Sequence, residues 1–353
     1  MTNLIDANTE HQILLTRVGT REARKFTPFL LEARNYIRAK LLDTENIRSQ
    51  KELRQLNAEI NEQLRAIYSE YTEVLQDDYP EISQLEIDFQ ERTISRASTG
   101  LEVVIPDIEQ AIAAARLTPM AIGQKGSAVY LDDWLKAFPR DEAKRAVNRI
   151  TMGFYTGETT AEIARAISGT RNSPGILNIT RANGWTMAKT GVTQMSQTAK
   201  ESFNKQNSDL IVGYTIVATL DSRTSDICKS YDGQEVLYTD SRQPMPPFHP
   251  NCRTSTAPLV NQKYRIENEG ERPSVGAKGA QEVPATETYY TWLKKQPAEY
   301  QNEALGKERA LIFRNSGLSP DEFRRATVDR FNQPLTIEQM AAKDERISSY
   351  VNE

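Results

Sequence analysis

The chain has 353 residues, of which 38% are hydrophobic, and this is enough for two or three domains with at least one sizeable core. A formal net charge of −4 with 26% charged residues argues against a dedicated nucleic-acid binder, because such proteins are usually basic over a whole domain. The sequence contains neither a long apolar run nor a basic leader followed by a hydrophobic stretch, so it predicts no membrane span and no secretory signal.

Residues 1–100 are expected to form a long helical hairpin, or arm. Apolar residues recur at steps of three and four over 26–41 and again over 53–74, with a polar break at 43–46 between them. The apolar stripe is narrow and its flanks are charged, so the hairpin either faces the core or docks on a partner. The second helix is expected to end at Tyr79-Pro80, because proline disfavours helical backbone in the residue before it.

A block of helices is predicted for residues 101–206. The apolar run 101–105 predicts a short strand, and a helix is expected to begin after it near Asp107. Glycines separate the helices that follow, and Thr159 or Thr160 is expected to cap the middle one. These further helices are predicted at 129–152, 159–169 and 177–206.

Residues 207–260 are predicted to form a small α+β unit, which we term the knot. Its β-branched run 211–220 predicts one strand, and 235–238 predicts a second strand after the Asp232-Gly233 turn. Residues 101–260 together are expected to be the central domain.

The rest of the chain divides into a linker and a tail. Residues 261–285 are polar and without periodicity, which predicts a linker. Residues 286–353 are predicted to be a C-terminal helical docking tail, whose aromatic side chains form a small core of their own. The predicted fold class is therefore mainly α with a small α+β unit.

Both cysteines of the chain and one of its two histidines fall within residues 221–258. Two thiolates and an imidazole are ligands that suit zinc, whose structural sites take four N, S or O donors in a tetrahedron. Cys228, His249 and Cys252 supply three such donors, so the sequence predicts a structural zinc site in the knot.

A fourth ligand is predicted from nearby carboxylates. Asp221 is the first choice, with Asp226, Asp232 or a water molecule as substitutes. Asp221 can instead accept backbone N–H bonds at the start of the following helix. Arg223 and Arg253 flank the cluster and are expected to pair with carboxylates rather than with phosphate.

The spacing of the ligands suits a metal that joins two separate elements. Two residues separate His249 from Cys252, so one turn stiffened by three prolines can aim both side chains at one point. Cys228 lies about twenty residues upstream, so a shared metal would stabilise the fold by a few kcal/mol, much as a disulfide does. Three alternatives stay open: a disulfide, two buried cysteines without a ligand, and a cysteine nucleophile with His249 as its base.

The familiar catalytic patterns are missing from the sequence. The deaminase pattern His-x-Glu with a later Pro-Cys-x-x-Cys does not occur, and His11 is too far away to form His-Glu-x-x-His with His249. The turn at 123–126 lacks the Ser or Thr of a phosphate-binding loop. We therefore expect a binding protein, not an enzyme.

Two motifs surround the predicted ligands. The first is Asp-x-Arg-Thr-Ser-x-x-Cys, which starts at Asp221 and is followed by Asp232-Gly233, and the second is Pro-Pro-x-His-Pro-Asn-Cys-Arg, which starts at Pro246. Together with residues 150–201, these motifs resemble the bacteriophage head-morphogenesis family, the Mu F-like minor head proteins. The resemblance covers roughly residues 105–260. Two departures are Thr254, where many relatives have a further cysteine, and Lys189-Thr190-Gly191, where relatives often carry Arg-Thr-Glu.

The resemblance implies a minor head protein that acts by assembly and binding. Its expected place is the virion, in the head interior or at the portal vertex, after assembly in the host cytoplasm. Its expected partners are the portal protein, a scaffold or the major capsid protein, with local DNA contact and self-association as further options. Its expected role is in head assembly, DNA packaging or genome release. Two rival functions are a metal- or thiol-dependent hydrolase carried by a phage, and a DNA-contacting ejection factor.

Overall fold

The computed structural model describes residues 3–44, 49–97, 102–123, 126–170, 172–264 and 270–352. Most of these residues are helical, and the strands are few, short and antiparallel. The predicted fold class, mainly α with a small α+β unit, is confirmed. In the part of the chain that is described, no helix has both the length and the apolar character needed to cross a bilayer.

The N-terminal hairpin is present, and each of its two halves consists of two consecutive helices. The first half is α1 (Leu4–Arg24) with α2 (Phe26–Asp43), and the second half is α3 (Gln50–Asp77) with α4 (Tyr79–Ala97). A helix ends just before Tyr79-Pro80, as predicted, but a further helix starts there with the proline in its first turn. The helix α1 was not predicted, because polar side chains such as Asn8, His11 and Glu22 occupy much of its buried face.

The central helices agree with the prediction, and the predicted strand before them does not. The helices are α5 (Ile108–Leu117), α6 (Leu131–Tyr155), α7 (Thr160–Ser168) and α8 (Ile176–Gln206). Thr159 and Glu162 form a capping box at the start of α7. Residues 102–107 are not a strand, and Leu101 lies outside the described residues. Val104 instead exchanges backbone hydrogen bonds of 2.7 and 2.8 Å with the Asn207 side chain, so no strand partner is required.

The knot contains a three-stranded antiparallel sheet in the order β2-β1-β3. Its strands are β1 (Ile211–Val217), β2 (Glu235–Leu237) and β3 (Ser255–Val260), and the short helix α9 (Asp226–Tyr231) lies between β1 and β2 in the chain. The two predicted strands are confirmed, although β1 ends before residue 220. The strand β3 was missed because it contains Pro258, which a sheet tolerates at its edge.

The prediction of a linker at 261–285 is wrong for its second half. A hairpin forms there from β4 (Glu271–Gly276) and β5 (Gly279–Pro284). The inward positions of β4 are Arg272, Ser274 and Gly276, so the strand shows no apolar alternation. Arg272 is buried and pairs with Asp232 in the knot, which fixes the hairpin in place.

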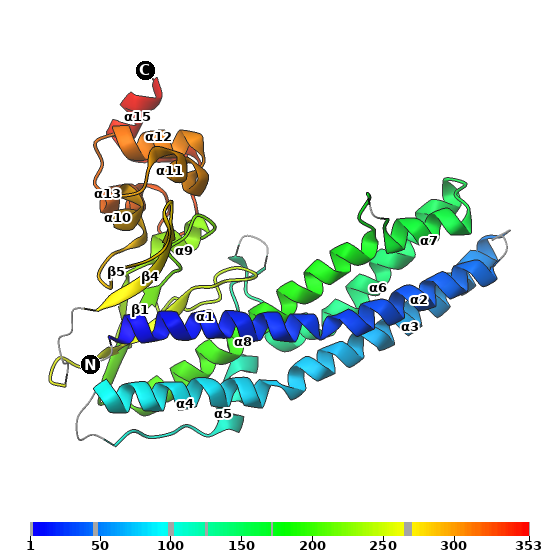
Figure 1. Cartoon of the computed structure of the whole chain (residues 1–353), viewed down its shortest axis with the longest axis horizontal. Helices are drawn as coiled ribbons and strands as arrows, with labels where there is room; N and C mark the ends of the chain where they lie inside the picture. The colour runs from blue at the N-terminus through cyan, green and yellow to red at the C-terminus, as the bar shows by residue number, and fades with distance from the viewer. Residues whose placement is uncertain are drawn as a thin grey trace.

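The C-terminal residues form a compact helical unit with a core of its own, as predicted for their aromatic side chains. Tyr290, Trp292, Phe313 and Phe323 are all buried in this core. Figure 1 shows the unit stacked beyond α9, away from the long helices α1–α4, α6 and α8, which form an extended limb. Its helices are α10 (Tyr289–Lys294), α11 (Ala298–Leu305), α12 (Lys307–Asn315), α13 (Pro320–Ala326), α14 (Ile337–Lys343) and α15 (Glu345–Asn352).

The helix α8 is the central element that both parts of the molecule share. It contacts α1, α4, α5 and α6 in the limb, and it also contacts β1 and β3 in the knot. Small residues allow this close approach, since a Cβ atom at Gly184 would lie 2.4 Å from the Phe26 ring. The knot is thus built directly on the long helices.

Candidate metal centre

The first ligand, Cys228, is positioned by the short helix α9. Ser225 caps this helix by accepting a hydrogen bond of 3.4 Å from the Cys228 backbone N–H. The cap fixes the backbone at Cys228, and the side chain is only 2% exposed. Cys228 belongs to the same buried cluster of the knot as Tyr214, Ile216 and Phe248.

The other two ligands lie on one turn that is tied to α8. Asn251 has a positive φ of 59°, which reverses the chain between His249 and Cys252. Its backbone N–H donates to Thr190 Oγ1 at 2.9 Å, and its side chain donates to Thr186 Oγ1 at 2.9 Å. These threonines were not predicted to position the turn, because only tertiary structure places them beside it.

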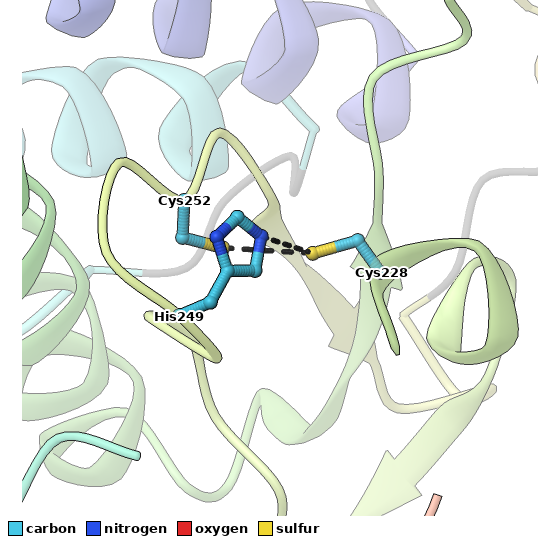
Figure 2. A group of neighbouring side chains, drawn as sticks. All are labelled: Cys228, His249 and Cys252. Atoms are coloured by element: carbon cyan, nitrogen blue, oxygen red, sulfur yellow. Dashed lines mark hydrogen bonds between the residues drawn. The ribbon is translucent and has the colours of Figure 1, made fainter. Parts of the chain in front are cut away.

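The three predicted ligands converge. The distance between Cys228 Sγ and His249 Nε2 is 3.2 Å, and that between the two sulfur atoms is 3.7 Å. All three ligand atoms lie within 4.8 Å of one another, which is close enough to hold a metal ion. Figure 2 shows the imidazole and both sulfurs directed at the same point.

The orientation of the imidazole also suits a ligand. His249 Nδ1 lies 2.8 Å from the carbonyl oxygen of Pro250, to which it donates. This second hydrogen bond leaves Nε2 as the atom that faces the sulfurs, the usual arrangement of a histidine that binds zinc. The set of two sulfurs and one nitrogen is one that zinc prefers.

The surroundings shift the pKa values of the two cysteines in opposite directions. Burial, together with the neighbouring Cys252, raises the pKa of the Cys228 thiol well above its usual value. Burial acts on Cys252 in the same sense, but hydrogen bonds with Cys228 and His249 hold the pKa of Cys252 well below its usual value. The surroundings therefore favour the thiolate form at Cys252 over the thiolate form at Cys228.

The two cysteines are both free in this structure. Their sulfur atoms are 3.7 Å apart, whereas a disulfide bond is about 2.05 Å long. The disulfide alternative is therefore not the arrangement observed, and the donors face one another as separate ligands.

Asp221, the predicted fourth ligand, lies outside the group of three. Its two oxygens accept hydrogen bonds of 2.6 and 2.9 Å from the Arg253 guanidinium. Oδ1 also accepts from the Arg223 backbone N–H and from the Thr224 hydroxyl, both at 3.0 Å. The pairing of Arg253 with a carboxylate is thus observed. The capping alternative for Asp221 is wrong, because Ser225 is the N-cap of α9 and Asp221 accepts the Arg223 backbone N–H in the turn before that helix.

Comparison with protein families identifies one segment of the chain. Residues 144–257 match the family model described as Phage Mu protein F like protein, and this confirms the resemblance seen in the sequence. The matched residues are under half of the chain, and they include Cys228, His249 and Cys252. Comparisons with curated proteins and with solved structures gave no match.

Proposed function

We propose that this chain, which carries a Phage Mu protein F like segment, is a minor structural protein of a bacteriophage head that acts by assembly and binding. The single observation behind this proposal is the family match over residues 144–257, because these residues include α8, α9 and all three candidate ligands. The match supports a phage head-related protein of the virion. Association with the portal and a part in DNA packaging or genome release are the finer proposals.

We further propose that Cys228, His249 and Cys252 hold a structural zinc ion. The ion would join α9 to the turn at 246–253, and through that turn to α8. Both cysteines are buried, which suits a structural site better than a site that turns over a substrate. The zinc would therefore stiffen the unit that links the limb to the C-terminal helices.

Particle composition tests the proposed role. Phage heads would be purified with the gene intact and with the gene interrupted, and the chain would be counted by quantitative mass spectrometry. We expect a few copies per head, with cross-links to the portal protein. Absence of the chain from purified heads would refute the proposal, and cross-links restricted to the major capsid protein would refute the portal association.

Single substitutions separate a structural site from a catalytic one. We expect Cys228→Ser, His249→Ala and Cys252→Ser to lower the melting temperature by a similar amount and to abolish the stabilising effect of added zinc. Thr156→Ala, at an exposed position near the end of the limb, serves as the control. Variants that fold as stably as the parent but lose a hydrolytic activity would favour the hydrolase instead.

The DNA-contacting alternative makes a different prediction. A chain with net charge −4 and no basic domain is expected to show little retention on DNA even at low salt. Retention that falls steeply between about 50 and 200 mM salt would favour an ejection factor that contacts DNA.

A further inference from the structure

Lys200, Asn8 and Glu86 meet in one buried cluster, although they belong to three different helices, α8, α1 and α4. Lys200 is 1% exposed, and Asn8 and Glu86 are fully buried. Lys200 Nζ lies 2.8 Å from Asn8 Oδ1 and 3.5 Å from Glu86 Oε1. The fold therefore holds an amine, a carboxamide and a carboxyl group together, away from water.

The hydrogen bonds of Lys200 direct its nitrogen at the carboxamide. Nζ donates to Ser255 Oγ at 3.0 Å and to the Thr256 carbonyl at 2.8 Å. An uncharged amine has two N–H groups, so these two acceptors satisfy both of them, and the lone pair takes the third direction, toward Asn8. The Cγ carbon of Asn8 is one C=O bond of about 1.23 Å beyond Oδ1, so the nitrogen is positioned close to the carbon that an amine attacks.

The carboxamide of Asn8 is polarised for such an attack. Its Oδ1 accepts a second hydrogen bond, of 3.1 Å, from Gln90 Nε2. When a nucleophile adds to Cγ, negative charge develops on Oδ1, and this bond stabilises that charge. Gln90 Nε2 also donates to Glu86 Oε1 at 2.7 Å, which fixes the donor in its position.

Burial makes the uncharged amine accessible. Burial lowers the pKa of the Lys200 ammonium group, and Glu86 opposes this effect. A proton that moves from Lys200 to Glu86 also removes the positive charge that helps to keep the pKa of Glu86 low. The ion pair of Lys200 with Glu86 is still the major form, so a reaction through the uncharged pair is slow, and freshly made chain keeps the ion pair.

We infer that Lys200 and Asn8 join in an isopeptide bond, a covalent cross-link between α8 and α1 that the folded chain forms by itself. Lys200 Nζ first gives a proton to Glu86 and then attacks Asn8 Cγ. The new N–C bond replaces the bond between Cγ and Nδ2 of Asn8. Glu86 relays two protons from the lysine to Nδ2, which leaves as an ammonium ion, and Glu86 ends as the carboxylate that it was at the start.

The cross-link would add a covalent modification that the proposed head function does not include. It would join the first helix of the limb to α8, beside the strand β3 of the knot. Its two ends are 192 residues apart in the chain, so it would close a large loop that stays closed after unfolding. Loop closure of this kind restricts the unfolded state and thereby stabilises the folded state.

Mass spectrometry of the full chain tests the inference. The purified protein would be kept at physiological temperature and sampled from hours to weeks. We expect the mass to fall by that of one ammonia molecule, with one ammonium ion released per chain. A protease digest is expected to yield a branched peptide that joins residues 8 and 200, and the denatured chain is expected to migrate faster in a gel because it contains a closed loop.

Four variants assign the roles. Asn8→Ala and Lys200→Met are expected to give no branched peptide. Lys205→Met, which removes a lysine that is 60% exposed on the same helix, is expected to give the branched peptide at the parental rate. Glu86→Gln is expected to slow the reaction by about a hundredfold, because the amide cannot relay the protons. The thermal melt of each variant confirms that it is folded.

The branched peptide of the parent chain decides whether the bond exists, even where a variant does not fold. Its absence after weeks of incubation would overturn the inference. Loss of ammonia that persists in Lys200→Met would show that another amide is its source, and this would also overturn the inference. A folded Glu86→Gln variant that reacts at the parental rate would overturn the role of Glu86 as the proton relay.

Discussion

Lys200 is a buried lysine at the junction of the limb and the knot. It lies on α8, its side chain is 1% exposed, and its Nζ donates to Asn8 Oδ1 at 2.8 Å, Ser255 Oγ at 3.0 Å and the Thr256 carbonyl at 2.8 Å. Glu86 lies 3.5 Å away and supplies the counter-charge. One ammonium group thus joins α1, α4 and β3 to α8.

Removing the ammonium group is expected to destabilise the whole junction. Lys200→Met removes the ammonium counter-charge of the buried Glu86 carboxylate, so we expect a loss of about 3–5 kcal/mol in the free energy of unfolding. The matched control is Lys205→Met on the same helix, because Lys205 is 60% exposed and its ion pair with Glu201 is worth at most about 1 kcal/mol. Urea unfolding measures both, and equal losses would contradict the prediction.

Glu86 also predicts how stability depends on pH. Burial alone would raise the pKa of this carboxyl, but Lys200, His11 and Gln90 outweigh burial and lower it from 4.5 to about 2. A lowered pKa stabilises the folded state above the unfolded value, and this stabilisation is lost as the pH falls from about 4.5 to about 2.

The measurement compares the parent chain with Glu86→Gln over this pH range. Near pH 6 we expect the parent to be more stable by about 3 kcal/mol, and we expect the difference to vanish near pH 2. A difference that stays constant between these pH values would show that Glu86 does not titrate as described.

At the scale of elements, α9 is held from two sides. A helix of six residues is not stable alone in water, so its position depends on its contacts. On one side Cys228 belongs to the candidate metal centre. On the other side Lys229 Nζ donates to the Ala304 carbonyl at 2.6 Å, and Arg324 donates to the Ser230 carbonyl at 3.2 Å.

Metal removal is therefore expected to act locally on α9 and on the turn at 246–253. After treatment with a chelator, we expect faster hydrogen exchange of these backbone amides and little change in α2 and α3, which pack far from the centre in a separate core. The control is Cys228→Ser, in which the chelator should have no effect. Hydrogen exchange that becomes faster over the whole chain would contradict a metal that stabilises only α9 and the turn at 246–253.

At the scale of the whole molecule, the C-terminal unit is packed on the chain's own knot. Tyr289 donates its backbone N–H to Asp232 and its hydroxyl to the Asp221 carbonyl at 2.8 Å. Arg309 pairs with Asp226, and Lys229 lies 5.5 Å from the centre of the Tyr289 ring. The divisions 1–100, 101–260, 261–285 and 286–353 stay proposals, although the core of the first hairpin is continuous with that of the central helices.

Truncation tests whether residues 286–353 are an appendage or part of the core structure. A chain that ends at residue 285 loses the Ala304 carbonyl that accepts from Lys229 and the Tyr289 backbone N–H that donates to Asp232, and both Lys229 and Asp232 are buried. We expect a lower melting temperature and weaker zinc binding, because α9 then has support from one side only. An unchanged melting temperature would indicate a tail that is free to dock on a partner.

The sequence alone determined the elements whose buried faces are apolar or whose ends carry caps. The period of three and four predicts α2 and α3, and Thr159 with Glu162 predicts the start of α7. It failed for α1 and β4, because Asn8, His11 and Arg272 fill buried positions with polar groups that are satisfied across the fold. The spacing of apolar residues along the sequence predicts which apolar side chains are buried, but it does not predict which polar side chains are buried.

The candidate metal centre was likewise predictable from the sequence in part, and the rest depended on the tertiary structure. The scarcity of cysteine and histidine was sufficient to select Cys228, His249 and Cys252 from the sequence, since few other soft donors exist in the chain. Only the tertiary structure decided that Asp221 turns to Arg253, and that threonines of α8 hold the turn of His249. Donor type is a property of the residue, whereas the choice between an ion and an arginine depends on which groups the fold places within reach.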